Sequence, residues 1–257
     1  MVDWGAGTYE TTAAELEPVA HVVVERARIS AGEDVVDVAC GTGNAALLAA
    51  ARGARVIGVD AAPRLLEVAR ERARAEGVVL DLREGDLLAL PVDDAAADVA
   101  LSVFGVIFAA DPAEALREIA RLLRPDGRAL LTAWIPAGPI DAMLAAMGRI
   151  IGRVTTPPPK RIAWADPNVV AALAGEAGLV LDETTRGELP IRAASPEAYI
   201  AAAQEHPVAV ATRPVIERAG VGDDVRNAMT AVLREANEDP GGFVVHSPYV
   251  VHELRAG

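Results

Sequence analysis

Short apolar runs alternate with helix-length amphipathic segments from about residue 34 onward. The apolar runs are typical of buried strands, and the segments between them carry apolar residues on one side and charged residues on the other. Strands are predicted at residues 34–39, 54–60, 78–83, 97–102 and 128–134. Helices are predicted at residues 43–52 and 64–76, and from Asp111 onward. Because strands that alternate with helices form a parallel sheet covered on both faces, we predict an open α/β sheet of the Rossmann-like class.

The helix that follows the fourth predicted strand has the clearest start. Asp111 can cap its first turn, and Pro112 suits the first helical position. Glu114 stands three residues after the cap, where the second half of a capping box is expected. We therefore predict that the side chains of Asp111 and Glu114 both bind backbone N–H groups at this end of the helix.

Two stretches, at about residues 136–166 and 191–242, break the alternation. The first is rich in Pro and Gly around one predicted helix at residues 140–152, and the second is mostly helical, with breaks expected at Pro207 and Pro214. Function often concentrates in long excursions from a rigid scaffold. We therefore predict that the two stretches form a helical cap that covers the substrate.

The remaining residues complete the predicted sheet. Two further strands are expected at residues 179–185 and 243–254, and the last of them is expected to run antiparallel to the others. We predict that residues 1–257 form a single domain. Its parts are an N-terminal flap helix at residues 1–29 and a core at residues 30–135, 167–190 and 243–257, in addition to the cap.

Composition narrows the function. The 257 residues carry 24 Lys and Arg against 37 Asp and Glu, and the formal charge of −13 would repel a phosphate backbone, so no nucleic-acid partner is expected. A single cysteine allows no internal disulfide, and no metal site is predicted. The longest uncharged apolar run, residues 99–110, is too short to span a bilayer, and the N-terminus lacks the features of a signal peptide. We expect a cytoplasmic protein without a membrane span.

The strongest local signal is the run DVACGTGN at residues 37–44, where a predicted strand passes into a helix. Glycine has no side chain, so a ligand can approach the backbone there and meet the N–H groups at the start of the helix. Residues 41–46 also satisfy the permissive form of the dinucleotide fingerprint, and Asp60 follows at about the distance of a ribose-binding acid. The glycines alone therefore leave the ligand open.

Three acidic residues help to decide which ligand binds. Asp37, Asp60 and Asp86 end three successive predicted strands, and ligands of open α/β sheets bind outside the carboxyl ends of the strands. A carboxylate at Asp37 would repel the pyrophosphate of a dinucleotide. S-adenosylmethionine has no phosphate and carries an ammonium and a sulfonium, so the same carboxylates attract it. The acidic residues therefore favour S-adenosylmethionine.

With these motifs in order, the chain resembles the class I S-adenosylmethionine-dependent methyltransferases, and within them the small-molecule group that includes ubiquinone/menaquinone-type enzymes. The resemblance covers about residues 30–135. It rests on the glycine run, GVD at residues 58–60, EGD at residues 84–86, Leu90 with Pro91, and LRPDG at residues 123–127.

The resemblance implies a role for each residue of the cofactor site. Gly41 and Gly43 make room for the methionyl part, and Asp37 binds its amino group directly or through water. Asp60 holds the ribose hydroxyls, and Asp86 contacts the adenine amino group. The other residues implied in binding S-adenosyl-L-methionine are Ala39, Ala61, Leu87, Ser102 and, from the N-terminal flap, Tyr9. S-adenosyl-L-homocysteine is the expected product.

Methyl transfer from a sulfonium is an in-line displacement, so the protein must chiefly align the acceptor with the methyl group and exclude water. A general base helps only when the acceptor must lose a proton. We name His206 first and His246 second as candidate catalytic bases. Trp134 and Trp164 flank the first excursion, and they either form an apolar wall for the acceptor or pack in the core.

We therefore predict an enzyme that methylates a small organic acceptor, such as a secondary metabolite or a quinone-like or aromatic compound. Two other functions fit the same motifs. Some relatives bind S-adenosylmethionine for a natural-product reaction without methylation, and an NAD(P)-dependent oxidoreductase would share the glycine run. The sequence leaves open the acceptor, the methylated atom and whether the protein is a monomer or a homodimer.

Overall fold

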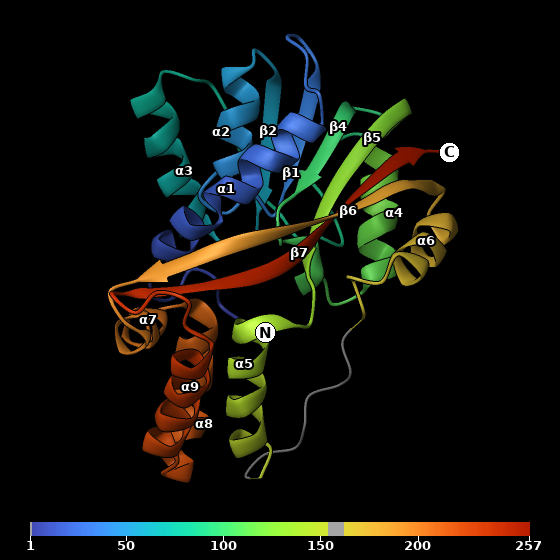
Figure 1. Ribbon diagram of the computed structural model, residues 1–257. Coiled ribbons are helices and arrows are strands. Elements are labelled where there is room, and N and C mark those ends of the chain that lie inside the picture. The colour runs from blue at the N-terminus through green and yellow to red at the C-terminus, as the bar shows by residue number, and fades with distance from the viewer. Residues whose placement is uncertain (1, 154–161) are drawn as a thin grey trace. The chain divides into compact units, whose positions relative to one another are not determined.

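The computed structural model describes residues 2–153 and 162–257. In this part of the chain, the strands form one seven-stranded sheet in the order β3-β2-β1-β4-β5-β7-β6 (Figure 1). The strands are β1 Asp34–Val38, β2 Arg55–Asp60, β3 Asp81–Glu84, β4 Ala97–Ser102, β5 Leu123–Trp134, β6 Leu179–Ala193 and β7 Phe243–Ala256. The strand order places β1 and β4 side by side near the middle of the sheet.

The chain divides into two compact units. The larger comprises residues 13–134, 162–187 and 249–257, and the smaller comprises the described residues within 1–12, 135–161 and 188–248. Strands β6 and β7 contribute residues to both units. The assignment of the whole chain to a single domain with a cap stays a prediction.

Parallel pairing brings the carboxyl ends of the central strands to one edge of the sheet. Strand β1 pairs in parallel with β2 and β4, β2 pairs with β3, and β4 pairs with β5. Strand β7 runs antiparallel to β5, with Thr132 opposite Val251. The prediction of a Rossmann-like, mostly parallel sheet with an antiparallel last strand is therefore confirmed.

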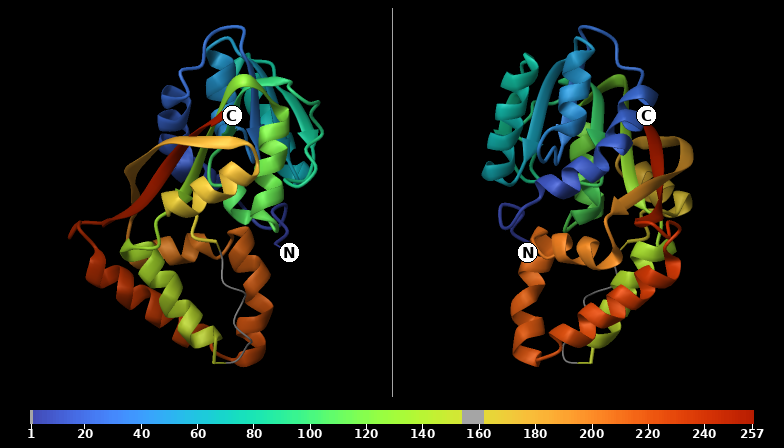
Figure 2. Two further views of the ribbon diagram at one scale, coloured as in Figure 1. Left: turned by 90° about the vertical axis from the view of Figure 1, so that its right-hand side faces the viewer. Right: turned by 60° about the vertical axis from the view of Figure 1, so that its left-hand side comes forward.

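Helices cover both faces of the sheet in the larger unit (Figure 1, Figure 2). Among the described residues, those on one face are α1 Glu10–Arg26, α2 Asn44–Ala51 and α3 Pro63–Glu76, and those on the other are α4 Pro112–Leu122 and α6 Pro167–Glu176. On α4, the side chains of Leu116, Ile119 and Leu122 are fully buried, and each contributes about 1.5–3 kcal/mol by leaving water. Within residues 2–153 and 162–257, no helix combines the length and apolar character needed to cross a membrane.

The smaller unit is mostly helical in its described residues. Its helices are α5 Gly138–Ile151, α7 Pro196–Ala203, α8 Pro207–Ala219 and α9 Gly222–Ala236. Helix α9 packs along α5 and also contacts α7. The break predicted at Pro207 is confirmed, because α8 begins there. The break predicted at Pro214 is wrong, because α8 continues past it. This proline is exposed, and its missing N–H removes only one hydrogen bond from the helix.

The bounds of β3, β5 and β6 differ from the prediction, and β5 begins at Leu123 rather than at residue 128. Strand β3 begins at Asp81 rather than at residue 78, because its pairing with β2 starts there and the preceding Val79 is 88% exposed. Strand β6 continues to Ala193 rather than ending at residue 185. It carries Pro190, a residue that is tolerated in strands at the edge of a sheet because one side of such a strand has no partner.

Only half of the predicted capping box forms at the start of α4. Asp111 Oδ1 accepts a hydrogen bond from the N–H of Glu114 at 3.1 Å. The Glu114 carboxylate pairs with Arg117, one turn further along the helix, so the expectation that it reaches back to the cap is wrong. A charged partner on the same helix face outweighs a backbone N–H that water can satisfy.

We expect Asp111→Ala to lower the free energy of unfolding by about 1 kcal/mol, the usual cost of losing an N-cap hydrogen bond. Glu114→Gln is the matched control, because an exposed ion pair contributes only about 0.2–1 kcal/mol. Urea unfolding of both variants measures the two values. A smaller loss in Asp111→Ala than in Glu114→Gln would contradict the assignment of Asp111 as the cap.

Candidate functional site

A turn with three left-handed residues joins β1 to α2. Ala39, Gly41 and Gly43 have φ values of 56°, 54° and 86°. Glycine adopts this conformation freely, whereas a residue with a side chain rarely does. At Gly43 the turn also packs closely, because a Cβ atom there would lie 3.2 Å from that of Ala69 on α3. The turn thus depends on its two glycines, and Ala39 holds a strained conformation beside them.

Asp37 is a buried carboxylate near the end of β1. Its side chain is 2% exposed, and Oδ2 accepts a hydrogen bond from the N–H of Ala46 in α2 at 2.9 Å. Burial, reinforced by the charge of Asp60 and opposed by the Ala46 hydrogen bond, raises the pKa of Asp37 to about 7. A carboxyl group in this environment ionises readily when a positive charge is placed beside it.

Asp60 is the last residue of β2 and contacts the same turn. Its Oδ2 accepts a hydrogen bond from the N–H of Gly41 and its Oδ1 accepts one from the N–H of Ala62, both at 2.8 Å. Burial raises the pKa of Asp60, and these N–H groups oppose the shift. Ala61, which lies between Asp60 and Ala62 in the sequence, is exposed. Two buried carboxylates from neighbouring strands thus border the glycine turn.

Asp86 follows β3 in a short turn and is exposed. Its Oδ1 accepts a hydrogen bond from the N–H of Leu88 at 2.8 Å, and Leu87 between them is half-buried. The N–H of Gly85 donates to the carbonyl of Asp60 at 3.1 Å and so joins the ends of β2 and β3. Asp86 therefore lies at the same edge of the sheet as the two buried acids, and its contact with a ligand stays a prediction.

Ser102 ends β4 and ties this strand to β1. Its fully buried hydroxyl donates to the carbonyl of Val38 at 2.9 Å and accepts from the N–H of Val106 at 3.0 Å. In the same loop, Gly105 lies so close to Ala39 that any side chain at residue 105 would collide with it. Ser102 thus orders this edge of the sheet and sets the loop after β4 against the glycine turn.

An aromatic cluster of Phe104, Trp134 and Tyr249 lies at the ends of β4 and β5. Phe104 stacks on Trp134, with ring centroids 3.9 Å apart and planes inclined by 8°, and Tyr249 meets Phe104 edge-on at 6.0 Å. Phe104 has a left-handed φ of 57°, and its N–H donates to Thr132 Oγ1 at 2.7 Å. Strained residues concentrate at functional sites. The stacking of these three rings on one another could not be predicted from the sequence, because it depends on how the neighbouring strands pair.

Trp164, the second tryptophan beside the first excursion, is buried. Its carbonyl accepts a hydrogen bond from His252 Nε2 at 2.7 Å, and His252 Nδ1 lies 2.8 Å from the hydroxyl of Thr184. Because a carbonyl can only accept, Nε2 of His252 carries a proton. Burial lowers the pKa of His252. These contacts favour a packing role for Trp164 and His252.

In the smaller unit, His206 lies at the start of α8 beside two aromatic residues of the N-terminal segment. Its ring centroid is 5.9 Å from that of Trp4 and 6.0 Å from that of Tyr9. His206 Nδ1 accepts a hydrogen bond from the N–H of Val208 at 3.2 Å and so caps the helix. Burial lowers the pKa of His206, so the ring is neutral at pH 7 with its proton on Nε2.

His246 lies on β7, and its Nδ1 is 3.0 Å from a carboxylate oxygen of Glu238. Its side chain is 38% exposed. Tyr9, His206 and His246 all belong to the smaller unit, whereas the glycine turn, the three acids and the aromatic cluster belong to the larger one. The catalytic roles of the two histidines and the contact of Tyr9 with the cofactor therefore stay predictions.

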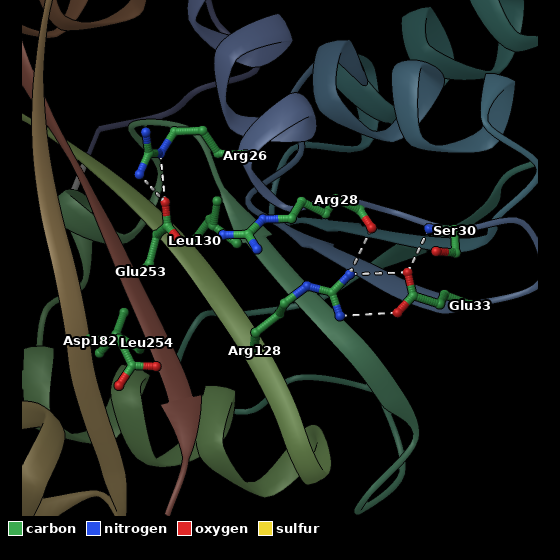
Figure 3. A pocket seen from close by; sticks show the side chains of 9 residues that line it. All are labelled: Arg26, Arg28, Ser30, Glu33, Arg128, Leu130, Asp182, Glu253 and Leu254. Atoms are coloured by element: carbon green, nitrogen blue, oxygen red, sulfur yellow. Dashed lines mark hydrogen bonds and ion pairs between the residues drawn. The ribbon is translucent and has the colours of Figure 1, made fainter.

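A hollow of about 460 Å³ lies on the larger unit where Glu33 directly precedes β1 (Figure 3). Its charged side chains largely pair with one another: both oxygens of Glu33 bind Arg128, and Glu253 binds Arg26. Ligands of open α/β sheets bind at the carboxyl ends of the strands, and this hollow lies at the amino end of β1. We therefore interpret it as a structural ion-pair cluster rather than as the cofactor site.

Comparison with known proteins identifies the type of domain. Residues 36–131 match a family model described as a methyltransferase domain. An uncharacterised protein of Mycobacterium tuberculosis is 35% identical over 190 residues, which cover 74% of this chain and 69% of the relative. Demethylmenaquinone methyltransferase of Thermus thermophilus is 40% identical over 115 residues, which cover 44% of this chain and 52% of that enzyme.

Solved structures share the fold at lower identity. The YcgJ protein of Bacillus subtilis is 21% identical with a TM-score of 0.63, and the match covers 92% of this chain and 97% of that one. The [4+2]-cyclase SpnF is 19% identical with a TM-score of 0.58, and the match covers 93% and 80% of the two chains. At these identities the likeness concerns the fold alone.

We expect Asp37→Asn to stabilise the ligand-free protein above neutral pH. Folding raises the pKa of Asp37 from 3.8 to about 7, so its contribution to stability is complete below pH 3.8 and is lost as the pH rises to about 7. At about 1.36 kcal/mol per pH unit, the loss is on the order of 4 kcal/mol. Urea unfolding between about pH 5 and about pH 8 should show the variant gaining steadily on the wild type.

Asp98→Asn is the control with the opposite sign. The N–H of Asp34 donates to Asp98 Oδ2 at 2.8 Å and, together with Arg124, lowers the pKa of Asp98. A carboxyl group whose pKa is lowered by folding stabilises the protein at pH values above its ordinary pKa, and this contribution is lost as the pH falls. Asp98→Asn should therefore be less stable than the wild type at neutral pH. If the free energies of unfolding of the wild type and of Asp37→Asn changed with pH in parallel, residue 37 would not be a buried carboxyl group with a raised pKa.

Proposed function

We propose a function from the premise that this chain belongs to the class I S-adenosylmethionine-dependent methyltransferases. The protein transfers the methyl group of S-adenosyl-L-methionine to a small organic acceptor and releases S-adenosyl-L-homocysteine. One observation carries the proposal: two carboxylates, Asp37 and Asp60, are buried beside a glycine turn at the carboxyl edge of a parallel sheet. Such a site suits a cationic ligand without phosphate.

The groups at this edge fit the cofactor. Bound S-adenosylmethionine supplies an activated methyl group on a sulfonium. Asp37 would accept a hydrogen bond from the ammonium group, and Asp60 would accept hydrogen bonds from the ribose hydroxyls. Asp86 would accept one from the adenine amino group, and Leu87 would cover the ring. The other residues proposed to line the cofactor are Ala39, Gly41, Gly43, Ala61, Ser102 and Tyr9.

The same carboxylates weigh against an NAD(P)-dependent oxidoreductase. A pyrophosphate on the glycine turn would lie beside Asp37 and Asp60, whose pKa values are already raised by burial. Like charges in so dry an environment repel each other more strongly than in water. A dinucleotide would therefore have to bind with Asp37 protonated, which is unfavourable at any pH above about 7.

We propose that the acceptor is small and apolar, either quinone-like or aromatic. Phe104 directly precedes Gly105, which touches Ala39, so the aromatic cluster stands next to the proposed cofactor site. Trp134 is half-buried, and aromatic faces bind planar apolar ligands by stacking. The likeness to a demethylmenaquinone methyltransferase supports this class of acceptor. The net charge of −13 argues against a nucleic acid.

In the proposed reaction, the acceptor attacks the methyl carbon in line while the carbon–sulfur bond breaks and its electron pair stays on sulfur. The protein contributes alignment and the exclusion of water, with the helices of the smaller unit as the proposed cover. An acceptor hydroxyl would also need a base. His206 is proposed first because its neutral ring can take a proton, although Nδ1 would then give up the Val208 hydrogen bond, and His246 is proposed second.

A reaction without methylation is the second candidate function. The [4+2]-cyclase SpnF has the same fold, and the proposed cofactor site would serve equally well if S-adenosylmethionine acted only as a bound cation. Incubation with S-adenosylmethionine and a panel of phenols and reduced naphthoquinones separates the two functions. Formation of S-adenosylhomocysteine supports methylation, and conversion of a panel compound without it supports the second candidate.

We expect Asp60→Ala and Gly41→Val each to weaken the binding of S-adenosylhomocysteine by roughly tenfold or more, the scale of losing one or two hydrogen bonds to a charged group. Asp60→Ala removes the acceptor of the ribose hydroxyls and of the Gly41 N–H. Gly41→Val forces a β-branched residue into a φ of 54°. Isothermal titration calorimetry measures both affinities, and circular dichroism confirms that the variants are folded.

Asp94→Asn is the control for these variants, because Asp94 is exposed and pairs with Arg121 rather than with the turn. Its affinity for S-adenosylhomocysteine should equal that of the wild type. Unchanged affinity in both Asp60→Ala and Gly41→Val would mean that the cofactor site is assigned wrongly. Tighter binding of NADH than of S-adenosylhomocysteine by the wild type would favour the oxidoreductase.

A further inference from the structure

Arg72 reaches from the middle of α3 to the glycine turn. A single guanidinium nitrogen, Nη1, donates to the carbonyl of Thr42 at 3.0 Å, to the hydroxyl of Thr42 at 3.3 Å and to Asn44 Oδ1 at 2.6 Å. The arginine is half-buried, and Thr42 is buried. A charged side chain from a neighbouring helix thus binds two residues of the turn that carries the proposed cofactor site.

The contact holds one peptide of the turn from both sides. In a trans peptide, the carbonyl and the N–H point in opposite directions. Between Thr42 and Gly43, the carbonyl binds Arg72, and the N–H of Gly43 donates to the carbonyl of Cys40 at 2.8 Å. This peptide links Thr42 to the left-handed Gly43, and the left-handed Gly41 precedes Thr42, so the two glycines otherwise leave this part of the turn free to adopt other conformations. Arg72 therefore supplies a constraint that the glycines lack.

Asn44 extends the contact to a third helix. While its Oδ1 accepts from Arg72, its Nδ2 donates to the carbonyl of Ala13 in α1 at 2.6 Å. The three helices α1, α2 and α3 lie on the same face of the sheet (Figure 1, Figure 2). Arg72 and Asn44 thus connect α3, the start of α2 and α1 around the turn.

Helix stability does not explain this position of Arg72. The amino end of a helix carries a partial positive charge, so a cation beside the start of α2 is unfavourable by itself. Nearby arginines of α3 have other partners: Arg74 pairs with Glu67 at 3.8 Å and is 71% exposed. The placement of Arg72 is accounted for by the acceptors that Thr42 and Asn44 present.

We propose that Arg72 is a positioning residue for the cofactor. It holds the Thr42–Gly43 peptide and the Asn44 side chain in the orientation that the cofactor meets, and it acts through these two residues without touching the cofactor. The identity of the cofactor rests on the function proposed above. The ordering of the turn by Arg72 stands independently of that identity.

The test compares two substitutions at residue 72 by calorimetric titration with S-adenosylhomocysteine. Arg72→Gln removes the positive charge and shortens the side chain, so it can no longer bind Thr42 and Asn44. We expect it to weaken the binding of S-adenosylhomocysteine by roughly tenfold, as for the loss of one charged hydrogen-bond donor. Arg72→Lys keeps one cationic nitrogen. Because all three contacts come from a single nitrogen, lysine should restore the affinity to within about threefold of the wild type. Arg74→Gln is the matched control on the same helix and should bind like the wild type.

Hydrogen exchange of the ligand-free variants gives a second readout, which a general loss of stability would not reproduce. Amides of residues 41–46 should exchange faster in Arg72→Gln, while those of the central strands β1 and β4 should keep the wild-type rate. Should Arg72→Gln not fold, Asn44→Ala removes one of the acceptors and should bind S-adenosylhomocysteine more weakly than the wild type.

The outcomes separate this proposal from the proposed function. Wild-type affinity in Arg72→Gln, equal losses in the Gln and Lys variants, or wild-type affinity in Asn44→Ala would each overturn the role of Arg72. If the wild type itself does not bind S-adenosylhomocysteine, the proposed function fails, and the exchange rates decide about Arg72. Unchanged exchange at residues 41–46 would then overturn its role in ordering the turn.

Discussion

The burial of two carboxylates at the ends of neighbouring parallel strands is the constraint on which the rest of the site depends. Asp37 and Asp60 are almost completely removed from water and accept hydrogen bonds from backbone N–H groups of α2 and of the glycine turn. The N–H groups reach the carboxylates because the turn adopts left-handed conformations that place α2 directly after β1. The positive end of α2 stabilises the charge that the acids carry. The sheet, the turn and α2 therefore form one electrostatic arrangement.

This arrangement is incomplete without a positive charge. Among the described residues, no Lys or Arg is one of the groups that shift the pKa of Asp37 or of Asp60, and burial raises both pKa values. A carboxylate that is desolvated and lacks a cationic partner costs free energy, which a cationic ligand returns on binding. The cationic side chain of Arg72 binds the same turn through Thr42 and Asn44 rather than through the two acids. We propose that the cofactor supplies the cation that these acids favour.

The sheet and the glycine turn between β1 and α2 could be predicted from the sequence because both follow from local patterns. Alternating apolar runs indicate the parallel strands, and Asp37 stands at a strand end that must meet its neighbours at one edge. The choice of side-chain partners could not be predicted in this way. Glu114 binds a cation of its own helix instead of the cap, and Arg72 crosses to the turn from another helix. Phe104 is held in a left-handed conformation by Thr132, a residue of the adjacent strand. Each of these contacts depends on distances between elements, which the residue pattern does not contain.

The number of protons released when S-adenosylmethionine binds tests the central claim most directly. At about pH 6, a carboxyl group with a pKa of about 7 is mostly protonated, and a bound ammonium group should ionise it. Calorimetry in buffers of different ionisation enthalpy should therefore detect the release of nearly one proton at about pH 6, where the free amino group is already protonated, and Asp37→Asn should abolish this release. Binding without proton release at about pH 6, or the same release in the variant, would contradict the account.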